Sequence, residues 1–146
     1  MKISTKGRYA LRVLLDLAEH RNEGFIPLKD ISRRQEISKK YLEQIIPVFA
    51  KAGFVETVRG AQGGYRLAGD PEKYSVGDIL RMTEGSLCPV DCVEKGAKVC
   101  PRCSDCLTLP IWQEYTKMVN DYFDSISLAD ILDRREKERK AGDYVI

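Results

Sequence analysis

The 146-residue sequence predicts a mostly helical chain of the α+β class. Three observations predict it. Three segments with helical spacing of apolar residues come first, two short strand-like runs around a glycine-rich turn follow, and a longer helical segment lies near the C-terminus. Hydrophobic residues make up 43% and charged residues 32%, which is typical of a soluble globular protein. Apolar runs stay short of the roughly 20 residues needed to cross a bilayer, so no membrane partner is expected.

Three helices are expected before the strands. They cover residues 4–20, 28–35 and 38–52, and in each the apolar side chains recur three or four positions apart. Ser38 stands where an N-cap belongs and opens the third helix. Pro47 lies inside that helix, so the sequence predicts a kink or an early irregularity there.

A β-hairpin is expected next. Strand-like runs cover residues 54–59 and 64–67, and the glycine-rich segment 60–64 forms the turn between them. A winged helix-turn-helix has the same element order, which is helix, helix, turn, helix and two-stranded ribbon. Its third helix enters the major groove of DNA. The alternative is an ordinary hairpin on a small α+β domain.

The second half of the chain predicts further helices. Ser75 caps a helix over residues 76–83, and Pro110 suits the first turn of a longer helix that carries two adjacent apolar stripes. A final short helix is expected to start at Ser127, and the charged residues 134–140 are expected to form an exposed tail.

Charge is distributed unevenly along the chain, whose net charge is +2. Residues 1–67 carry 13 basic and 7 acidic side chains, whereas residues 68–146 carry 11 and 15. A basic half joined to an acidic half suggests a part that binds a polyanion and a part with another role. Two ordinary solvated faces would give the same charges, so the motifs have to decide.

Residues suited to DNA contact lie at the start of the third helix and at the hairpin tip. Lys39 and Lys40 suit phosphates. Gln44 suits adenine, and Glu43 can accept a hydrogen bond from cytosine. Because a carboxylate repels phosphates unless its partner base is present, Glu43 is a candidate for discrimination between sites. Arg59 can place a guanidinium in a narrow minor groove. The expected DNA-binding set is Ser38, Lys39, Lys40, Tyr41, Glu43, Gln44, Arg59 and Gly60.

All five cysteines lie within residues 88–106, in a segment without helical or strand periodicity. An odd number of cysteines without a secretion signal argues against a disulfide framework and for a reduced, cytoplasmic compartment. Crowded thiolates typically hold a metal, although direct oxidant sensing is an alternative. By spacing alone, four of the thiols fit a zinc site at least as well as an iron–sulfur cluster. These four are Cys88, Cys92, Cys100 and Cys103, and Cys106 is spare.

Four motifs resemble one known family. They are MKISTKGRYA at residues 1–10, SKKYLEQI at 38–45, AGFV at 52–55 and RGAQGGY at 59–65. Together they are similar to the small winged-helix regulators that include the iron–sulfur cluster regulator IscR, the nitric-oxide sensor NsrR and the cysteine-metabolism regulator CymR. The resemblance covers essentially the whole chain.

The resemblance implies a homodimeric transcription factor that binds an imperfect palindrome in double-stranded DNA. Residues 1–84 would form the winged helix-turn-helix domain, with the helix-turn-helix around residues 28–51. Residues 85–109 would form a cysteine-rich metal-binding loop. Residues 110–146 would form a dimerisation helix and a C-terminal tail.

In cluster-binding members, three cysteines lie between the fourth helix and the dimerisation helix, a place that Cys92, Cys100 and Cys106 occupy here. This implies a sensor of iron–sulfur or redox status that carries a 2Fe-2S cluster. A 4Fe-4S cluster and a zinc ion are the alternatives. IscR-like members add a histidine where this chain has Leu109, and NsrR-like members add an acidic residue where it has Arg8. The fourth ligand therefore stays open, and the candidates are Cys88, Cys103 and Asp105.

A cluster-sensing repressor has two alternatives. A cysteine-metabolism regulator controlled by a partner enzyme fits the family but not the three cysteines, and a zinc-stabilised DNA-binding protein also fits the loop. An enzyme is not expected, because the one histidine, His20, allows no Ser/His/Asp constellation. His20 itself is expected at the surface, at the end of the first helix.

Overall fold

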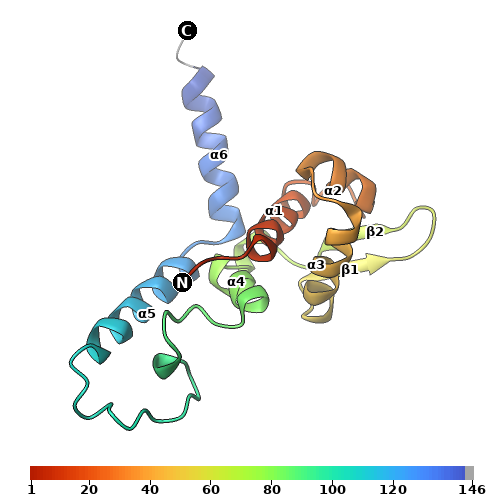
Figure 1. The fold of residues 1–146 in the computed structure, drawn as a ribbon. Coiled ribbons are helices and arrows are strands. Elements are labelled where there is room, and N and C mark those ends of the chain that lie inside the picture. Colours follow the sequence, from red (N-terminus) through yellow and green to blue (C-terminus); the bar gives the residue numbers. More distant parts are fainter. Residues whose placement is uncertain (144–146) are drawn as a thin grey trace.

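Helix α1 (Thr5–Glu19) is the element around which the others pack in the computed structural model, which describes residues 1–143 (Figure 1). Ser4 begins the helix by accepting a hydrogen bond from the N–H of Gly7 at 3.0 Å. The apolar face of α1 is fully buried and contacts α2, α3, α4, α6 and the hairpin. Its buried apolar residues are Ala10, Val13, Leu14, Leu17 and Ala18, which are the residues of the predicted stripe.

Helices α2 (Leu28–Gln35) and α3 (Lys39–Lys51) form the predicted helix-turn-helix. Between them Glu36 has a left-handed backbone, with φ 54°, and Ser38 caps α3 by accepting from the N–H of Tyr41 at 3.2 Å. The irregularity expected at Pro47 does not interrupt the helix, which continues to Lys51. Pro47 lies on the exposed side of α3. The opposite face of the helix is buried in the main core, and this packing keeps the residues around Pro47 helical.

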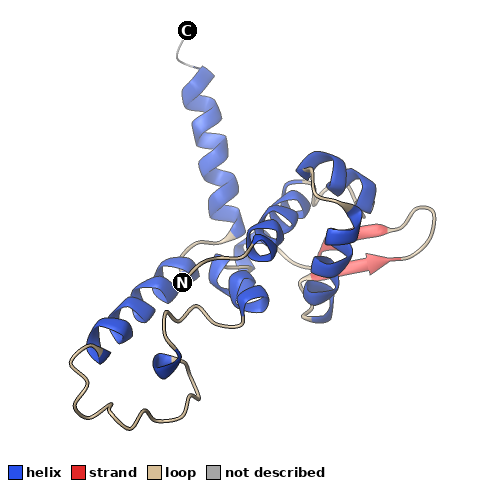
Figure 2. Cartoon of the chain, viewed as in Figure 1, coloured by secondary structure: helices blue, strands red, loops and turns tan. Residues whose placement is uncertain are grey.

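The hairpin, or wing, consists of β1 (Val55–Val58) and β2 (Gly64–Leu67) in antiparallel register (Figure 2). Ile26 forms an isolated antiparallel bridge to β2. Its N–H donates to the carbonyl of Tyr65 at 2.8 Å, and its carbonyl accepts from the N–H of Tyr65 at 2.9 Å. A side chain at Gly64 would collide with the backbone of Ile26. Glycine at this position therefore allows the wing to lie against the segment that precedes α2.

Helix α4 (Val76–Glu84) leads into the cysteine-containing loop, and α5 (Leu109–Asp124) follows it. Two short 3₁₀ turns, η1 (Pro71–Lys73) and η2 (Asp91–Val93), flank α4 in the chain. A small second core holds α5 against α4; its buried members are Val76, Leu80, Leu87 and Ile126, and Val119 and Phe123 pack against them.

The final helix is longer than the sequence predicts. Helix α6 (Leu128–Asp143) includes the charged segment that was expected to be a tail, and its outer half projects from the body of the molecule (Figure 1). Ser127 and Asp130 cap it reciprocally, at 2.9 and 3.0 Å, and these hydrogen bonds lower the pKa of Asp130. Glu136 and Lys140 pair one turn apart at 3.2 Å. These local contacts explain how so polar a segment is helical. Among residues 1–143, no helix is long and apolar enough to span a membrane.

An ion pair between a buried carboxylate and a partly exposed arginine fastens α2 to α1. Asp16 is the one charged residue that is fully buried among the described residues, with 1% of its surface exposed. The Nε of Arg34 donates to both carboxylate oxygens, at 2.9 and 3.0 Å, and its Nη2 donates to one of them at 2.7 Å. The hydrogen bond to Asp16 raises the pKa of Arg34. The pair is thus a bidentate link between the first two helices.

His20 lies at the end of α1, as expected, and its half-buried side chain contacts the same cluster. Its Nδ1 lies 2.8 Å from the carbonyl oxygen of Asp16 and 3.4 Å from the Asp16 carboxylate, and its side chain is 22% exposed. Because a carbonyl oxygen only accepts, Nδ1 carries the hydrogen.

Removing the cation from the buried pair is expected to destabilise the fold. Arg34→Met should lower the free energy of unfolding by about 2–4 kcal/mol, because it leaves the Asp16 carboxylate buried without its main partner. Urea unfolding followed by circular dichroism measures it. The control is Arg33→Met, whose exposed cation lies 3.5 Å from Asp30, and its effect should stay within about 0.5 kcal/mol. Equal losses in the two variants would contradict a special role for the buried pair.

Candidate DNA-binding surface and cysteine loop

The first turn and a half of α3 forms an exposed polar surface. Lys39, Lys40, Glu43 and Gln44 are exposed, while Leu42 between them is fully buried and anchors the helix. In the described part of the chain, neither lysine is within ion-pair distance of a carboxylate. The residues predicted to read DNA therefore lie together on one accessible face.

Two residues of α1 that no sequence pattern indicates, Tyr9 and Arg12, support the start of α3 and the end of α2. The ring of Tyr9 on α1 packs edge-on against the ring of Tyr41, with centroids 5.2 Å apart. The guanidinium of Arg12 lies 5.2 Å from the Tyr9 ring centroid, and its Nε donates to the side chain of Gln35 at 3.3 Å. Tyr9 was visible in the sequence only as part of the family-like opening motif.

The wing tip presents Arg59 and Gly60 to solvent, as predicted. Gly60 has φ 111°, a conformation that favours glycine, and its carbonyl accepts from the N–H of Gly63 at 3.0 Å. A side chain at Gly63 would collide with the carbonyl of Val58. Two of the tip glycines are thus required by the tightness of the turn.

A groove of about 570 Å³ separates α3 from the wing. Glu43 and Pro47 line it from α3, and Val58, Arg59 and Tyr65 line it from the wing. The fold therefore brings Glu43 and Arg59, which are 16 positions apart, to opposite walls of one groove. A wall that carries a carboxylate and a wall that carries a guanidinium can read two neighbouring features of the same polyanion.

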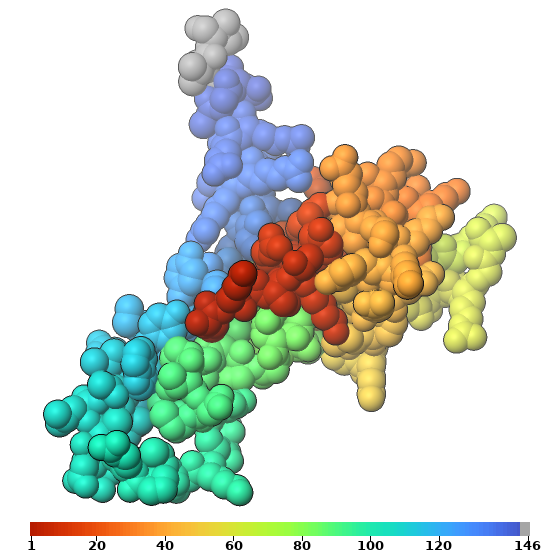
Figure 3. Space-filling view, viewed as in Figure 1, coloured from red at the N-terminus to blue at the C-terminus, as the bar shows by residue number. Residues whose placement is uncertain are grey.

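The cysteine loop, residues 85–108, connects α4 to α5 and lies at the end of the molecule opposite the wing (Figure 3). All five thiols are free; Cys92 and Cys103 are exposed, and Cys88, Cys100 and Cys106 are half-buried. Apart from η2, the loop consists of turns and irregular backbone.

Local hydrogen bonds set the conformation around three of the cysteines. The N–H of Cys88 donates to Ser86 Oγ at 3.1 Å, and its Sγ lies 3.8 Å from the carbonyl of Val93. The N–H of Cys103 donates to the carbonyl of Cys100 at 3.0 Å. The Sγ of Cys106 lies 3.4 Å from Thr108 Oγ1, and this hydrogen bond is the main cause of the lowered pKa of Cys106.

The predicted metal ligands share this loop, but the described residues do not gather them at one point. Among residues 1–143, no three His, Cys, Asp or Glu side chains converge as metal ligands do. The predicted ligands are therefore close in the chain, but no three of them converge on one point. They are Cys92, Cys100 and Cys106, with the candidates Cys88, Cys103 and Asp105. Their chemistry still fits an iron–sulfur cluster, because free, accessible thiols are the ligands that such clusters use.

Within residues 1–143, one stripe of α5 has no apolar partner. Val119 and Phe123 pack against the small second core. On another face, large apolar side chains are 40–63% exposed, and they recur at helical spacing. They are Ile111, Tyr115, Met118 and Tyr122.

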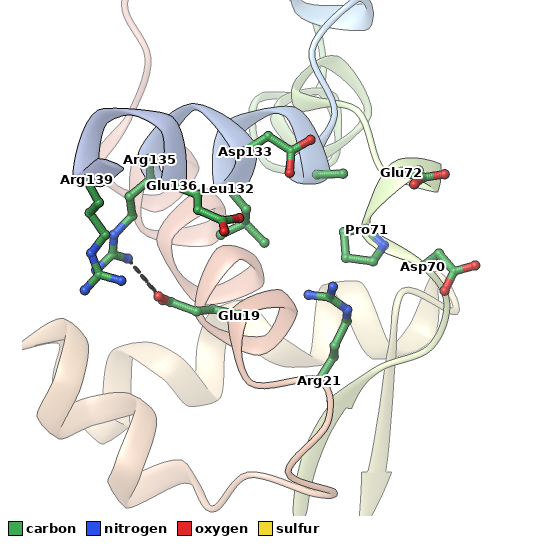
Figure 4. Close-up of a pocket in the computed structure, with 11 residues that line it drawn as sticks. Glu19, Arg21, Asp70, Pro71, Glu72, Leu132, Asp133, Arg135, Glu136 and Arg139 are labelled. Carbon is green, nitrogen blue, oxygen red and sulfur yellow. Dashed lines mark hydrogen bonds and ion pairs between the residues drawn. The ribbon is translucent and has the colours of Figure 1, made fainter. Parts of the chain in front are cut away.

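A second pocket, of about 440 Å³, lies where α6 crosses the end of α1 (Figure 4). Two of its charged side chains neutralise each other, because Arg135 pairs with Glu19 at 3.0 Å. Arg21 and Asp70 border it from the other side. None of the predicted site residues lines this pocket.

Comparison with known proteins agrees with this arrangement. Residues 3–134 match the Rrf2 family model, described as "Iron-dependent Transcriptional regulator". The chain is 43% identical over 132 residues to the protein rrf2 of Nitratidesulfovibrio vulgaris, covering 90% of this chain and 87% of that protein. Among solved structures it resembles T. potens IscR, with a TM-score of 0.75, 41% identity and coverage of 94% and 90%. It also resembles CymR, the global cysteine regulator of B. subtilis, with a TM-score of 0.74, 36% identity and coverage of 92% and 98%.

The predicted family resemblance and the predicted winged-helix fold are both confirmed, and the members of this family are regulators and not enzymes. With the family model covering nearly the whole chain, this protein belongs to the Rrf2 family of transcriptional regulators.

Proposed function

We propose that this chain is a homodimeric, sequence-specific regulator of transcription that senses iron–sulfur or redox status through an iron–sulfur cluster, foremost of the 2Fe-2S type. One observation carries the proposal: a surface suited to DNA and a loop of five free thiols belong to the same small fold. The likeness to T. potens IscR supports it.

On the DNA side, the start of α3 enters the major groove and the wing tip enters the adjacent minor groove. Lys39 and Lys40 contact phosphates, and Glu43 and Gln44 face base edges. The groove between α3 and the wing receives the strand that separates the two DNA grooves. The wing is held to the segment before α2 through Ile26, so Arg59 keeps a fixed offset from α3.

On the sensing side, Cys92, Cys100 and Cys106 would hold the cluster. A bound cluster would supply a redox-active centre, and its loss would free these thiols. The lowered pKa of Cys106 favours the thiolate, which is the form that binds iron.

A continuous set of contacts joins the loop to the DNA-facing helix. Glu84, the last residue of α4, accepts from the N–H of Ser4 at 3.2 Å and from its hydroxyl at 2.5 Å. Ser4 caps α1, and Tyr9 on α1 packs against Tyr41 on α3. Movement of the loop root would therefore be passed to α3 through a single helix.

For the homodimer, the exposed stripe of α5 is the proposed contact. Its apolar side chains lie along one face of a 16-residue helix, and a two-fold axis would pair this face with itself. Each copy would then present one α3 to one half of an imperfect palindrome.

Arg59→Ala is expected to weaken binding to a cognate operator by about 1–3 kcal/mol at fixed salt, because the guanidinium is the group that enters the minor groove. Fluorescence anisotropy with labelled DNA measures it. The matched control is Arg66→Ala, because Arg66 pairs with Glu56 at 2.6 Å and covers the Phe25 ring, and its loss should leave affinity nearly unchanged. Unchanged affinity of the Arg59 variant would remove the wing from the interface.

Met118→Asp is expected to weaken dimerisation by about tenfold or more, because it buries two like charges near the two-fold axis. Analytical ultracentrifugation over a concentration series measures the dissociation constant. Gln113→Asp adds the same charge on an exposed position of α5 outside the stripe, so that variant should remain as dimeric as the parent protein. Dissociation of both variants to the same extent would point away from the stripe.

The cluster itself is tested on protein purified without oxygen. A brown dimer with two irons and two sulfides per chain, whose operator affinity differs from that of the cluster-free protein, is the expected outcome. Absorption spectroscopy and native mass spectrometry of one sample measure it. A colourless protein with one zinc per chain would replace the cluster by a zinc site. A metal-free protein that is regulated by a partner would favour the CymR-like alternative, which the structural likeness to that regulator supports.

A further inference from the structure

We infer that Cys103 is the fourth ligand, so that four thiolates of a single loop, Cys92, Cys100, Cys103 and Cys106, hold the cluster. The inference rests on the proposed iron–sulfur function. It concerns a residue for which the loop offers two rivals, Cys88 and Asp105.

The chain's only imidazole lies at the wrong end of α1. His20 follows the last residue of this 15-residue helix, which is about 22 Å long. The opposite end of the helix is the one that meets the root of the cysteine loop, through Ser4 and Glu84. His20 is also occupied, because its Nδ1 faces the carbonyl of Asp16. A nitrogen ligand from the same chain is therefore out of reach of the loop.

Cys103 lies on a turn that already pairs it with Cys100. The N–H of Cys103 donates to the carbonyl of Cys100 at 3.0 Å, and residues 101–105 form consecutive turns that end at Cys106. Three thiols thus recur at every third position of one short, curled segment. Two cysteines separated by two residues in a turn are a common way to ligate one metal ion. Cys103 is also exposed, so its side chain can move to meet iron without breaking a packed contact.

Cys88 is held at the root of the loop. The preceding residue, Leu87, is 2% exposed in the core that joins α4 and α5. The N–H of Cys88 is bonded to Ser86, and its thiol lies against the carbonyl of Val93. Moving Cys88 to a cluster on residues 100–106 would disturb this packing, so Cys88 is better suited to shaping the loop than to binding iron.

Asp105 is the weaker donor on chemical grounds. Its carboxylate is a hard oxygen ligand, whereas iron–sulfur clusters are held by thiolates. Cys103 lies in the same run of turns and offers the softer ligand. To hold one cluster, the thiols of Cys100, Cys103 and Cys106 would have to converge within these turns, and Cys92 on η2, which contacts α5, would have to approach them.

The test compares Cys103→Ala with Cys88→Ala in the full-length protein purified without oxygen. Iron and acid-labile sulfide per chain, together with the electron paramagnetic resonance spectrum of the reduced protein, are measured for each. Cys103→Ala should lose most of the iron or change the spectrum, and Cys88→Ala should match the parent protein. His20→Ala is a further control that should leave the spectrum unchanged. Far-ultraviolet circular dichroism confirms that every variant is folded.

The parent protein supplies an independent readout. Ligation by four thiolates makes the reduction potential independent of pH across the range in which imidazole titrates, whereas an imidazole ligand would make it fall with rising pH. Loss of iron in Cys88→Ala but not in Cys103→Ala would overturn the inference in favour of Cys88. Retention of an unchanged cluster in both variants would overturn it in favour of another donor. Absence of iron from the parent protein would instead defeat the proposed function.

Discussion

The pairing of the buried Asp16 carboxylate with Arg34 is the interaction on which the arrangement of the DNA-facing half depends. It fixes α2 on α1, and the tight left-handed turn at Glu36 then determines where α3 begins. A carboxylate with no exposed surface has few alternative partners, so a shift of α2 by one turn would remove its guanidinium and leave only His20 beside it. The ion pair therefore contributes to the choice of one helix packing as well as to stability.

Helix α1 carries contacts of two kinds at its two ends. Near its C-terminus the ion pair holds α2, and at its N-terminus Ser4 is bonded to Glu84 beside the cysteine loop. Between them, Tyr9 contacts the first turn of α3. Because α1 and its N-cap contact both α3 and Glu84, the last residue before the loop, α1 is the route that the proposed coupling would use.

Sequence patterns predicted those parts of the fold that depend on local spacing. The first three helices and the hairpin follow from apolar periodicity, Ser38 and the glycines around residues 60–64. The length of α6 was underestimated, because its outer half has few apolar residues and is supported instead by capping and by pairs such as Glu136 with Lys140. The Asp16–Arg34 pair could not be foreseen, since 18 positions separate the partners and no periodicity links them. For the cysteine loop the sequence predicts the donor side chains. Their positions relative to one another depend on an irregular backbone that no periodicity predicts.

The position of the loop relative to α5 gives the proposed sensor a mechanical basis. Cys106 lies two residues before Thr108, the N-cap residue of α5, and the hydrogen bond between their side chains joins the last proposed ligand to the start of that helix. The same helix packs against α4 through one face and exposes its apolar stripe on another. A change in the loop would thus act at the first turn of the proposed dimer helix and, through Arg81 of α4, which donates to Asn120 at 2.7 Å, on the packing of α4. Because the spacing of the two α3 helices in a dimer depends on how the two α5 helices meet, a small rotation there would change the fit of both helices to a palindrome at once.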